Sequence, residues 1–449
     1  MLSTFLSPRR RPRSRISGLA LAIALTTGAA VTTAALETPA FAQKKKKKDE
    51  TAQAEQKNYS DAFIAAYQPN EALLNAPTPD VAALQAAVAP VTAAATTPDD
   101  KFVAGNFVYN TGVKAQDQSL QLRGLEMMLA SGKTPSANAG QFNYVAGSLA
   151  YEAEDYTKAR QYIEAALAAG YSASDPTGVL VETYIKGGQP AEGLAFLKRK
   201  VDEQLAAGQK PDQAFLRRGL AVAYENNLAD QARDFALMYA AQYPTNDSWG
   251  DAIVVTRSLT PMNETEMLDL LRLQRQTGTF RQKNELLEYV DALDARTMPG
   301  EVVAVIDEGY SSGLIPRSDP YAKEAYSAAQ SRISSDRAEL PGLERDASQA
   351  SAKPALVVSA GDTFLNYDQP EKAEKFYRMA LDKAGTDKNM LMTRIGIAQV
   401  YAGNYAEAQQ TLEQVTGNRQ YIAELWSAYA AQQANGTTSP ATQAAVTGG

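Results

Sequence analysis

The chain contains an internal repeat, and this feature limits its fold more than any other. The stretch Phe102–Asn110, FVAGNFVYN, returns as Tyr144–Glu152, YVAGSLAYE. Self-similarity at a period of a few tens of residues indicates stacked supersecondary units, because each unit buries its apolar face only against its neighbours. The sequence therefore predicts a repeat architecture.

Apolar residues recur with the period of an α-helix. In one segment they fall at i, i+3, i+4, i+7 and i+8, on one face of a helix: Ala159, Tyr162, Ile163, Ala166 and Leu167. The same stripe returns between residues 373 and 381. Alternation with a period of two is absent over most of the sequence, which argues against sheets. The predicted fold class is all-α.

Small residues recur at fixed distances within these units. A glycine is followed twelve residues later by an alanine, and in two units by a second alanine seven further on, which would let two helices approach closely. The pairs are Gly147 with Ala159 and Ala166, Gly361 with Ala373 and Ala380, and Gly396 with Ala408, while Gly105 stands in the first copy where Gly147 stands in the second. Equivalent positions of successive units are 34 or 35 residues apart, as from Ala373 to Ala408. This pattern resembles the tetratricopeptide repeat (TPR) family, in an exported bacterial form.

The resemblance implies a right-handed solenoid of antiparallel helical hairpins. The polar composition of residues 43–58 separately predicts a disordered arm before it. The unit around residues 220–224 fits the pattern only with a one-residue deletion before Ala232, and the repeats between 249 and 351 are too worn to phase. A longer helix is expected there, at about 321–339. Trp426 and Tyr429 are expected to cover the last repeat. The expected segments are a signal peptide (1–42), a basic polar arm (43–58), short Ala/Pro-rich helices (59–98), N-terminal repeats (99–248), degenerate repeats (249–351), a C-terminal repeat pair with a capping helix (352–434) and a disordered tail (435–449).

The first residues have the pattern of a secretory signal. Five arginines between residues 9 and 15 precede an apolar stretch from Ile16 to about Ala35, and Ala40-Phe41-Ala42 provides small residues for cleavage. We expect cleavage after Ala42, export to the periplasm and no integral membrane span in the mature chain. The alternative is an uncleaved membrane anchor.

The charge of the chain argues against nucleic-acid binding. The formal charge is −7, and removing residues 1–42, which carry a net +4, leaves −11. Five consecutive lysines, Lys44, Lys45, Lys46, Lys47 and Lys48, follow the expected cleavage site. They could contact a glycan or anionic lipid, and the alternative is a solvated arm.

No catalytic residue, metal site or cofactor is predicted. The chain has neither cysteine nor histidine, which removes the commonest general base and metal ligand. The G-x-S-x-G match at residues 309–313 lacks a histidine to activate its serine and repeats the helix end at 170–172. Gly132-Lys133-Thr134 lacks the earlier glycine of a phosphate-binding loop, because position 127 is Met127. A glycosidase using two carboxylates remains a third hypothesis.

The resemblance implies that ligands bind the concave face, formed by the first helix of each hairpin. Tyrosine and asparagine there suit recognition of a peptide or a sugar, and the alternative for the tyrosines is packing between repeats. The expected partner-binding residues are Phe102, Asn106, Tyr109, Asn110, Tyr144, Ser148, Tyr151, Glu152, Arg217, Arg218, Asn366 and Tyr401.

The predicted function is a non-enzymatic periplasmic scaffold that binds a protein or peptide during cell-envelope assembly. A rigid curved surface would lower the ordering cost of capture. The alternative is a carbohydrate-associated module in polysaccharide export or cell-wall maintenance.

Overall fold

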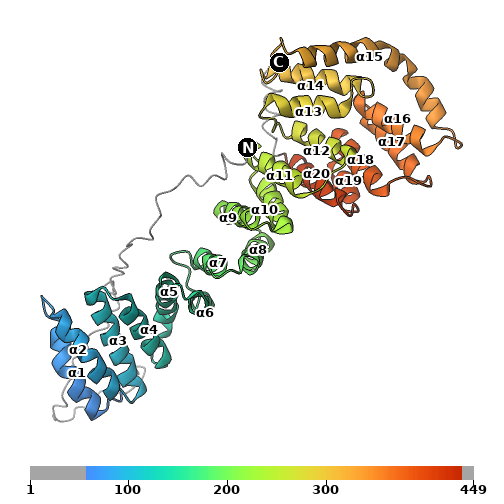
Figure 1. The fold of residues 1–449 in the computed structure, drawn as a ribbon. Helices are drawn as coiled ribbons and strands as arrows, with labels where there is room; N and C mark the ends of the chain where they lie inside the picture. The colour runs from blue at the N-terminus through green and yellow to red at the C-terminus, as the bar shows by residue number, and fades with distance from the viewer. Residues whose placement is uncertain (1–56, 437–449) are drawn as a thin grey trace. The chain divides into compact units, whose positions relative to one another are not determined.

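The computed structural model describes residues 57–436, which form twenty α-helices and, within that range, no strand (Figure 1). The predicted all-α class is confirmed. The chain divides into two compact units between Leu149 and Ala150, a different boundary from the sequence-based segments at 248 and 351. The expected signal peptide, Lys44–Lys48, nearly all of the arm and most of the tail lie outside the described residues.

The described part of the first unit consists of five helices, the last of which crosses into the second unit. Each of the first four helices begins after a capping residue whose side chain accepts a hydrogen bond from a backbone amide of the first turn: Ser60, Asp80, Thr97 and Asp117. The core is built from fully buried side chains such as Phe63, Leu84, Val91 and Phe107. The helices are α1 (Asp61–Leu74), α2 (Val81–Ala94), α3 (Pro98–Ala115), α4 (Gln118–Ala130) and α5 (Ser136–Glu152).

A buried carboxylate joins the beginnings of α1 and α3. Asp100 Oδ2 accepts hydrogen bonds from Ser60 Oγ at 2.8 Å and from the Thr97 amide at 3.0 Å, and Oδ1 accepts one from the Ser60 amide at 3.1 Å. Burial raises the pKa of Asp100, but the hydrogen bonds from Thr97 and Ser60 bring it below its usual value. Asp100 thus fixes the start of the first hairpin stack.

Glycines let α3 and α4 approach with backbone nearly in contact. A Cβ added to Gly105 would lie 2.7 Å from the carbonyl oxygen of Gly124, and one added to Gly124 would lie 2.6 Å from that of Gly105. Gly105 therefore lies in close contact with α4.

The second unit begins with helices packed in antiparallel hairpins. Its first part contains α6 (Tyr156–Ala168), α7 (Pro176–Lys186), α8 (Pro190–Ala206), α9 (Gln213–Glu225) and α10 (Ala229–Gln242). Its second part contains α11 (Asn246–Leu259), α12 (Glu264–Gln276), α13 (Lys283–Leu293), α14 (Pro299–Ser311), α15 (Pro320–Ala347), α16 (Pro354–Asn366), α17 (Pro370–Leu381), α18 (Lys388–Tyr401), α19 (Tyr405–Leu412) and α20 (Arg419–Ala434). The long α15 covers the helix expected at 321–339.

In three hairpins a glycine of the first helix receives a large side chain from the second helix, sixteen residues later. The ring of Phe235 lies over Gly219 and the ring of Tyr377 over Gly361, while a Cβ on Gly396 would lie 2.5 Å from Leu412. At each of these crossings a glycine therefore meets a large side chain, whereas two small side chains were expected to meet there.

The predicted packing alanines are all fully buried, with 0% exposure: Ala159, Ala166, Ala373, Ala380 and Ala408. Gly147 lies on α5 in the first unit and Ala159 lies in the second. Their pairing therefore stays a prediction.

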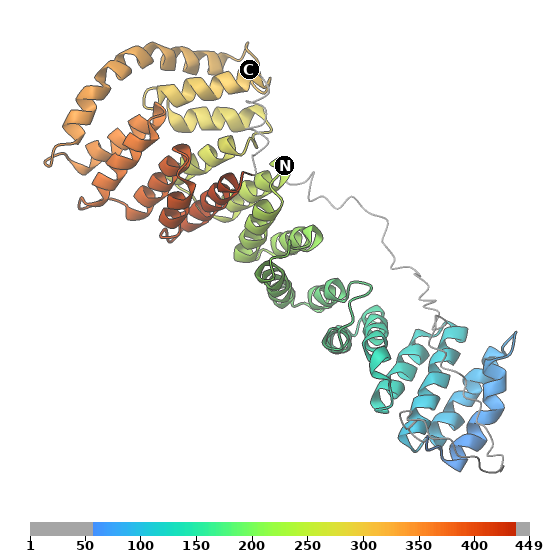
Figure 2. The same cartoon turned by 180° about the vertical axis from the view of Figure 1, so that it is seen from behind.

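The second unit closes on itself through its last helix. Besides its neighbours α18 and α19, α20 contacts α10, α11 and α12 (Figures 1 and 2). The indole Nε1 of Trp426 donates to the carbonyl oxygen of Asp269 at 3.0 Å, and Trp249 Nε1 donates to Gln432 Oε1 at 2.9 Å. Trp426 and Tyr429 were expected only to cover the last repeat, whereas they also bind α12, since the Tyr429 hydroxyl donates to the Gln276 carbonyl at 3.4 Å.

We call the helices from α10 to α20 the closed part of the second unit, because α20 returns to contact α10. Two helices lie in its interior. Residues 391–400 of α18 are all buried, and so are residues 268–274 of α12. A helix that is buried on every side lies inside the protein rather than on its surface. The polar side chains that these helices carry must therefore find partners within the protein.

We predict that Gly361→Ala destabilises the second unit by about 1–3 kcal/mol, because the new methyl group overlaps the buried ring of Tyr377. The control is Gly342→Ala within α15, where the nearest atom to an added Cβ is 3.8 Å away. That change should be neutral or stabilise by up to about 1 kcal/mol. Urea unfolding followed by circular dichroism measures both, and equal effects would contradict the close approach.

Ring closure makes a second prediction. Arg419→Ala should cost about 1.5–3 kcal/mol, because it removes the 2.7 Å ion pair of the buried Asp269, which keeps only its longer contacts with Arg272 and Arg394. Arg378→Ala removes the pair between the exposed Arg378 and the half-buried Glu374 on α17 and should cost less than about 1 kcal/mol. Urea unfolding compares the two variants. An Arg419 variant as stable as the Arg378 variant would show that α20 does not hold the ring closed.

Candidate interaction surface

A network of charged side chains fills the interior of the closed part. The Asp269 carboxylate, which is fully buried, lies 2.7 Å from Arg419, 3.4 Å from Arg272 and 3.6 Å from Arg394. Arg272 also pairs with Glu301 at 3.0 Å. These residues come from α12, α14, α18 and α20, so the network joins helices that are distant in sequence.

This network corrects the expectation for Asn366 and Tyr401, which were placed on an open concave face. Asn366 is 6% exposed, and its Oδ1 accepts the Glu301 amide at 2.9 Å. The Tyr401 ring lies 6.1 Å from that of Trp426, and burial raises the pKa of its hydroxyl to about 12. Because the ring is closed, both side chains pack toward its interior rather than on an open face.

The predicted residues of the first unit are only partly accessible. Phe102, Asn106 and Asn110 are half-buried, and Asn110 Nδ2 donates to Asn106 Oδ1 at 3.0 Å, one turn away on α3. Tyr109 is 6% exposed and Tyr144 is 7% exposed. These two tyrosines therefore pack inside the protein, which corrects their assignment to a ligand-facing surface.

The remaining residues near the end of α5 are more open. The Ser148 hydroxyl donates to the Tyr144 carbonyl at 2.9 Å and is half-buried. Tyr151 is half-buried, with its ring edge-on to Tyr156 at 5.5 Å, and Glu152 is exposed. Their role in binding stays a prediction.

Arg217 and Arg218 are the exposed members of the predicted set on α9. Arg218 Nε donates to Glu182 of α7 at 2.8 Å. Similar pairs, each about one repeat apart in sequence, join Arg281 to Asp247 at 3.1 Å and Arg257 to Glu288 at 2.5 Å. These pairs join α9 to α7 and α13 to α11, and Arg281 lies in the segment just before α13.

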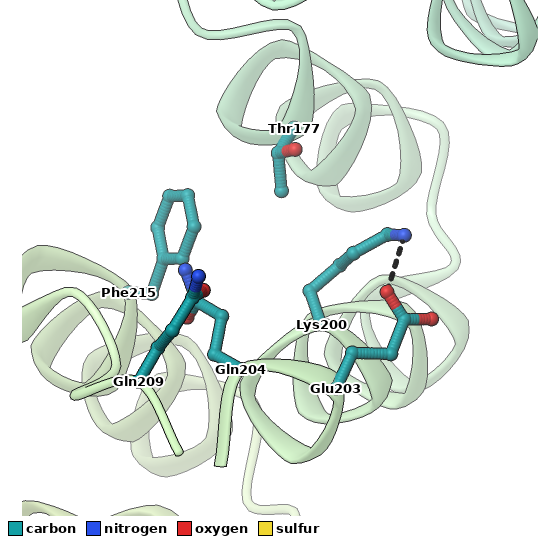
Figure 3. A pocket seen from close by; sticks show the side chains of 6 residues that line it. All are labelled: Thr177, Lys200, Glu203, Gln204, Gln209 and Phe215. Carbon is teal, nitrogen blue, oxygen red and sulfur yellow. Dashed lines mark hydrogen bonds and ion pairs between the residues drawn. The ribbon is translucent and has the colours of Figure 1, made fainter. Parts of the chain in front are cut away.

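A hollow of about 230 Å³ opens between α7, α8 and α9 (Figure 3). Its six lining side chains surround an open centre and differ in chemistry: Thr177, Lys200, Glu203, Gln204, Gln209 and Phe215. Phe215 is half-buried, and Lys200 pairs with Glu203 at 2.7 Å.

The position of the two glutamines follows from the end of α8. Gly208 has a left-handed backbone, with φ +68°, and donates to the Leu205 carbonyl at 2.9 Å, while the Gln209 amide donates to the Gln204 carbonyl at 2.8 Å. This is the Schellman arrangement, which brings the side chains at positions 204 and 209 together. Sequence reasoning did not identify this hollow, although the glycine at 208 was a visible signal for the turn.

Residues 57–436 contain no group of three or more acidic side chains arranged to hold a metal ion. Within the same range, no helix is both long enough and apolar enough to cross a bilayer. Ser311 of the G-x-S-x-G match lies at the end of α14 and donates to the Glu308 carbonyl at 3.0 Å, as expected for a helix end.

No family model and no curated protein matches the sequence. Among solved structures, the chain is similar to Naa15/Naa10 bound to HypK-THB, with 14% identity over 81% of this chain and 59% of that chain and a TM-score of 0.33. It is also similar to the TPR domain of P58(IPK), with 14% identity over 84% of this chain and 99% of that chain and a TM-score of 0.20. The chain thus spans 59% of the length of the first. The hairpins described above, rather than these scores, define the fold.

The interior network makes stability depend on pH. Burial raises the pKa of Glu301, but Arg272 and the Tyr289 hydroxyl bring it below its ordinary value of 4.5. Below about pH 4.5 the unfolded chain therefore binds a proton at this position that the folded chain does not, and stability falls as the pH falls. We predict that Glu301→Gln removes this component.

Urea unfolding between pH 6 and pH 3 measures this pH dependence of stability. The wild-type unfolding free energy should decline more steeply than that of the variant. At pH 7 the variant should be the less stable of the two, because the buried Arg272 has lost its carboxylate. Parallel curves over the whole range would contradict the role of Glu301.

Proposed function

We propose that the protein is a non-enzymatic scaffold that binds a protein or peptide partner on the exposed face of α7 and α9. One observation carries the proposal: ring closure buries most of α12 and α18, whereas Arg217 and Arg218 stay exposed on α9, the helix whose Phe215 lines a hollow. Interfaces are enriched in arginine and aromatic side chains, and Phe215 and the two arginines lie on this one helix.

The contacts that hold this face in place support binding. The Arg218–Glu182 pair and the hairpin contact of Gly219 with Phe235 hold α9 against its neighbours. A surface that is ordered before it meets its partner loses less conformational entropy on association. The side chains of the face are therefore ready to make contacts without a rearrangement of the backbone.

The setting of this activity is part of the proposal. The arginine-rich start, the apolar stretch and Ala40–Ala42 support export to the periplasm. We place the scaffold in cell-envelope assembly on that basis. The partner would then be an envelope protein or an exported peptide.

We predict that a photo-crosslinking amino acid at Arg217, introduced into the full chain in its own cells, captures a defined protein partner. The same group at Asn106 tests the predicted face of the first unit. Gln330, which is exposed on α15, provides the matched control and should capture much less. Mass spectrometry identifies the adducts.

Capture from Gln330 alone would show that the partner binds elsewhere. Adducts that contain glycan rather than protein would favour the carbohydrate-associated alternative. The export proposal would be contradicted if the protein recovered from cells still carried residues 1–42, or if fractionation placed it in the cytoplasm.

A further inference from the structure

Two opposite charges on α9 and α11 lie near each other without forming an ion pair. Burial raises the pKa of Asp251 on α11, and the positive charges of Arg281 and Arg217 offset only part of this rise. The guanidinium of Arg217 therefore acts on the carboxylate of Asp251. Within the described residues the two groups are not paired, so the nitrogen and oxygen atoms that carry their charges are more than 4.0 Å apart.

The charges around these two groups are already neutralised. Arg218 pairs with Glu182 at 2.6 Å, and Asp247 pairs with Arg281 at 3.1 Å. The guanidinium of Arg217 and the carboxylate one turn after Asp247 form neither a hydrogen bond nor an ion pair within residues 57–436. One positive and one negative group are thus left to bind something else.

Solvent reaches both groups. Arg217 is exposed, and Asp251 is half-buried, with neither of its carboxylate oxygens closed off from water. In the free protein, water therefore supplies their hydrogen bonds. A ligand can displace this water without a loss only if it offers an acceptor to the guanidinium and a donor to the carboxylate.

The opposite signs of the two charges limit the kind of ligand. A ligand carboxylate would be attracted by Arg217 and repelled by Asp251, and a ligand ammonium would meet the reverse. A peptide group carries no net charge, donates through its N–H and accepts through its C=O. In the trans form these two bonds point in opposite directions, which suits a group held between a positive and a negative side chain.

We propose that Arg217 and Asp251 bind the main chain of an extended segment of the partner. The guanidinium donates to a backbone carbonyl oxygen, and the carboxylate accepts a hydrogen bond from a backbone N–H. The segment is extended because the main-chain groups inside a helix already bond each other. Hydrogen bonds to charged groups are stronger than neutral ones, so the two bonds hold a segment regardless of its side chains. The inference rests on the proposed function, whose partner it describes.

The test measures binding of an uncharged alanine–serine hexapeptide, acetylated and amidated, to the protein purified from cells. Saturation-transfer NMR compares it with the same peptide methylated at every backbone nitrogen, which removes the N–H donors and keeps the side chains. Methylation should weaken binding at least about threefold. Equal binding of the two peptides, or no binding of either, would overturn the proposal.

Further ligands test the class of partner. Hexapeptides with glutamate or lysine in place of serine test the charge, and a trimer of N-acetylglucosamine tests a sugar. The uncharged peptide should bind at least as tightly as each of them. Tighter binding of either charged peptide or of the sugar would overturn recognition of the main chain.

Variants locate the bound peptide. Arg217→Ala and Asp251→Ala should each weaken binding of the alanine–serine peptide at least about threefold, as expected for the loss of one hydrogen bond. Asp251→Asn keeps an acceptor oxygen and should bind more tightly than Asp251→Ala. The matched controls are Arg345→Ala and Asp346→Ala, at exposed positions of α15, which should stay within about twofold of wild type. Equal binding by all four alanine variants would overturn the assignment.

Two further measurements separate this inference from instability and from the proposed function. Circular dichroism and urea unfolding check that each variant is folded, and the methylated peptide is tested on the unaltered protein. A photo-crosslinking group at Ala214, which is exposed three residues before Arg217 on α9, leaves the arginine in place. Capture of a protein there without main-chain binding would leave the scaffold proposal standing while this inference fails. Main-chain binding without capture would do the reverse.

Discussion

The second unit depends on a single buried carboxylate. Asp269 on α12 receives the guanidinium groups of Arg272, Arg394 and Arg419, which belong to α12, α18 and α20. Removing a carboxylate from water costs several kcal/mol unless opposite charges and hydrogen bonds compensate it. The compensation exists only when all three helices are in place. This requirement explains why helices with so many charged side chains are found in the interior.

The hairpins could be predicted because each is specified within a short stretch of sequence. The apolar stripe from Ala159 to Leu167 lies within α6, and the recurring small residues at Gly361 and Gly396 mark the crossings of two pairs. The repeats could not be aligned where a glycine was required exactly twelve residues before an alanine. The unit that required a deletion before Ala232 has Gly219 sixteen residues before Phe235, the spacing of the other two pairs. What is constant is a glycine beneath a large side chain.

The candidate site was less predictable, because exposure depends on distant parts of the chain. Asn366 and Tyr401 occupy first-helix positions that would face solvent in an open solenoid. Arg419 meets Asp269 across 150 residues of sequence, and no repeat of about 34 residues specifies that contact. Arg217 and Arg218, which were expected to bind a partner, are exposed on α9, and their role stays a prediction. The hollow lined by Phe215 of the same helix arises from a helix end, where two glutamines meet only after the chain has turned at Gly208.

Ring closure also has a consequence for the order in which the protein can mature. Trp249 and Gln432 are bonded across 183 residues, so the closing contacts form only after the last helix has been synthesised. Local hairpins assemble quickly, whereas pairings between distant segments are slow. Until α20 docks, the apolar and charged sides of α12 remain open to solvent and to other chains, and such exposed surfaces favour aggregation. The nascent protein is therefore most vulnerable during the interval between the synthesis of α12 and that of α20.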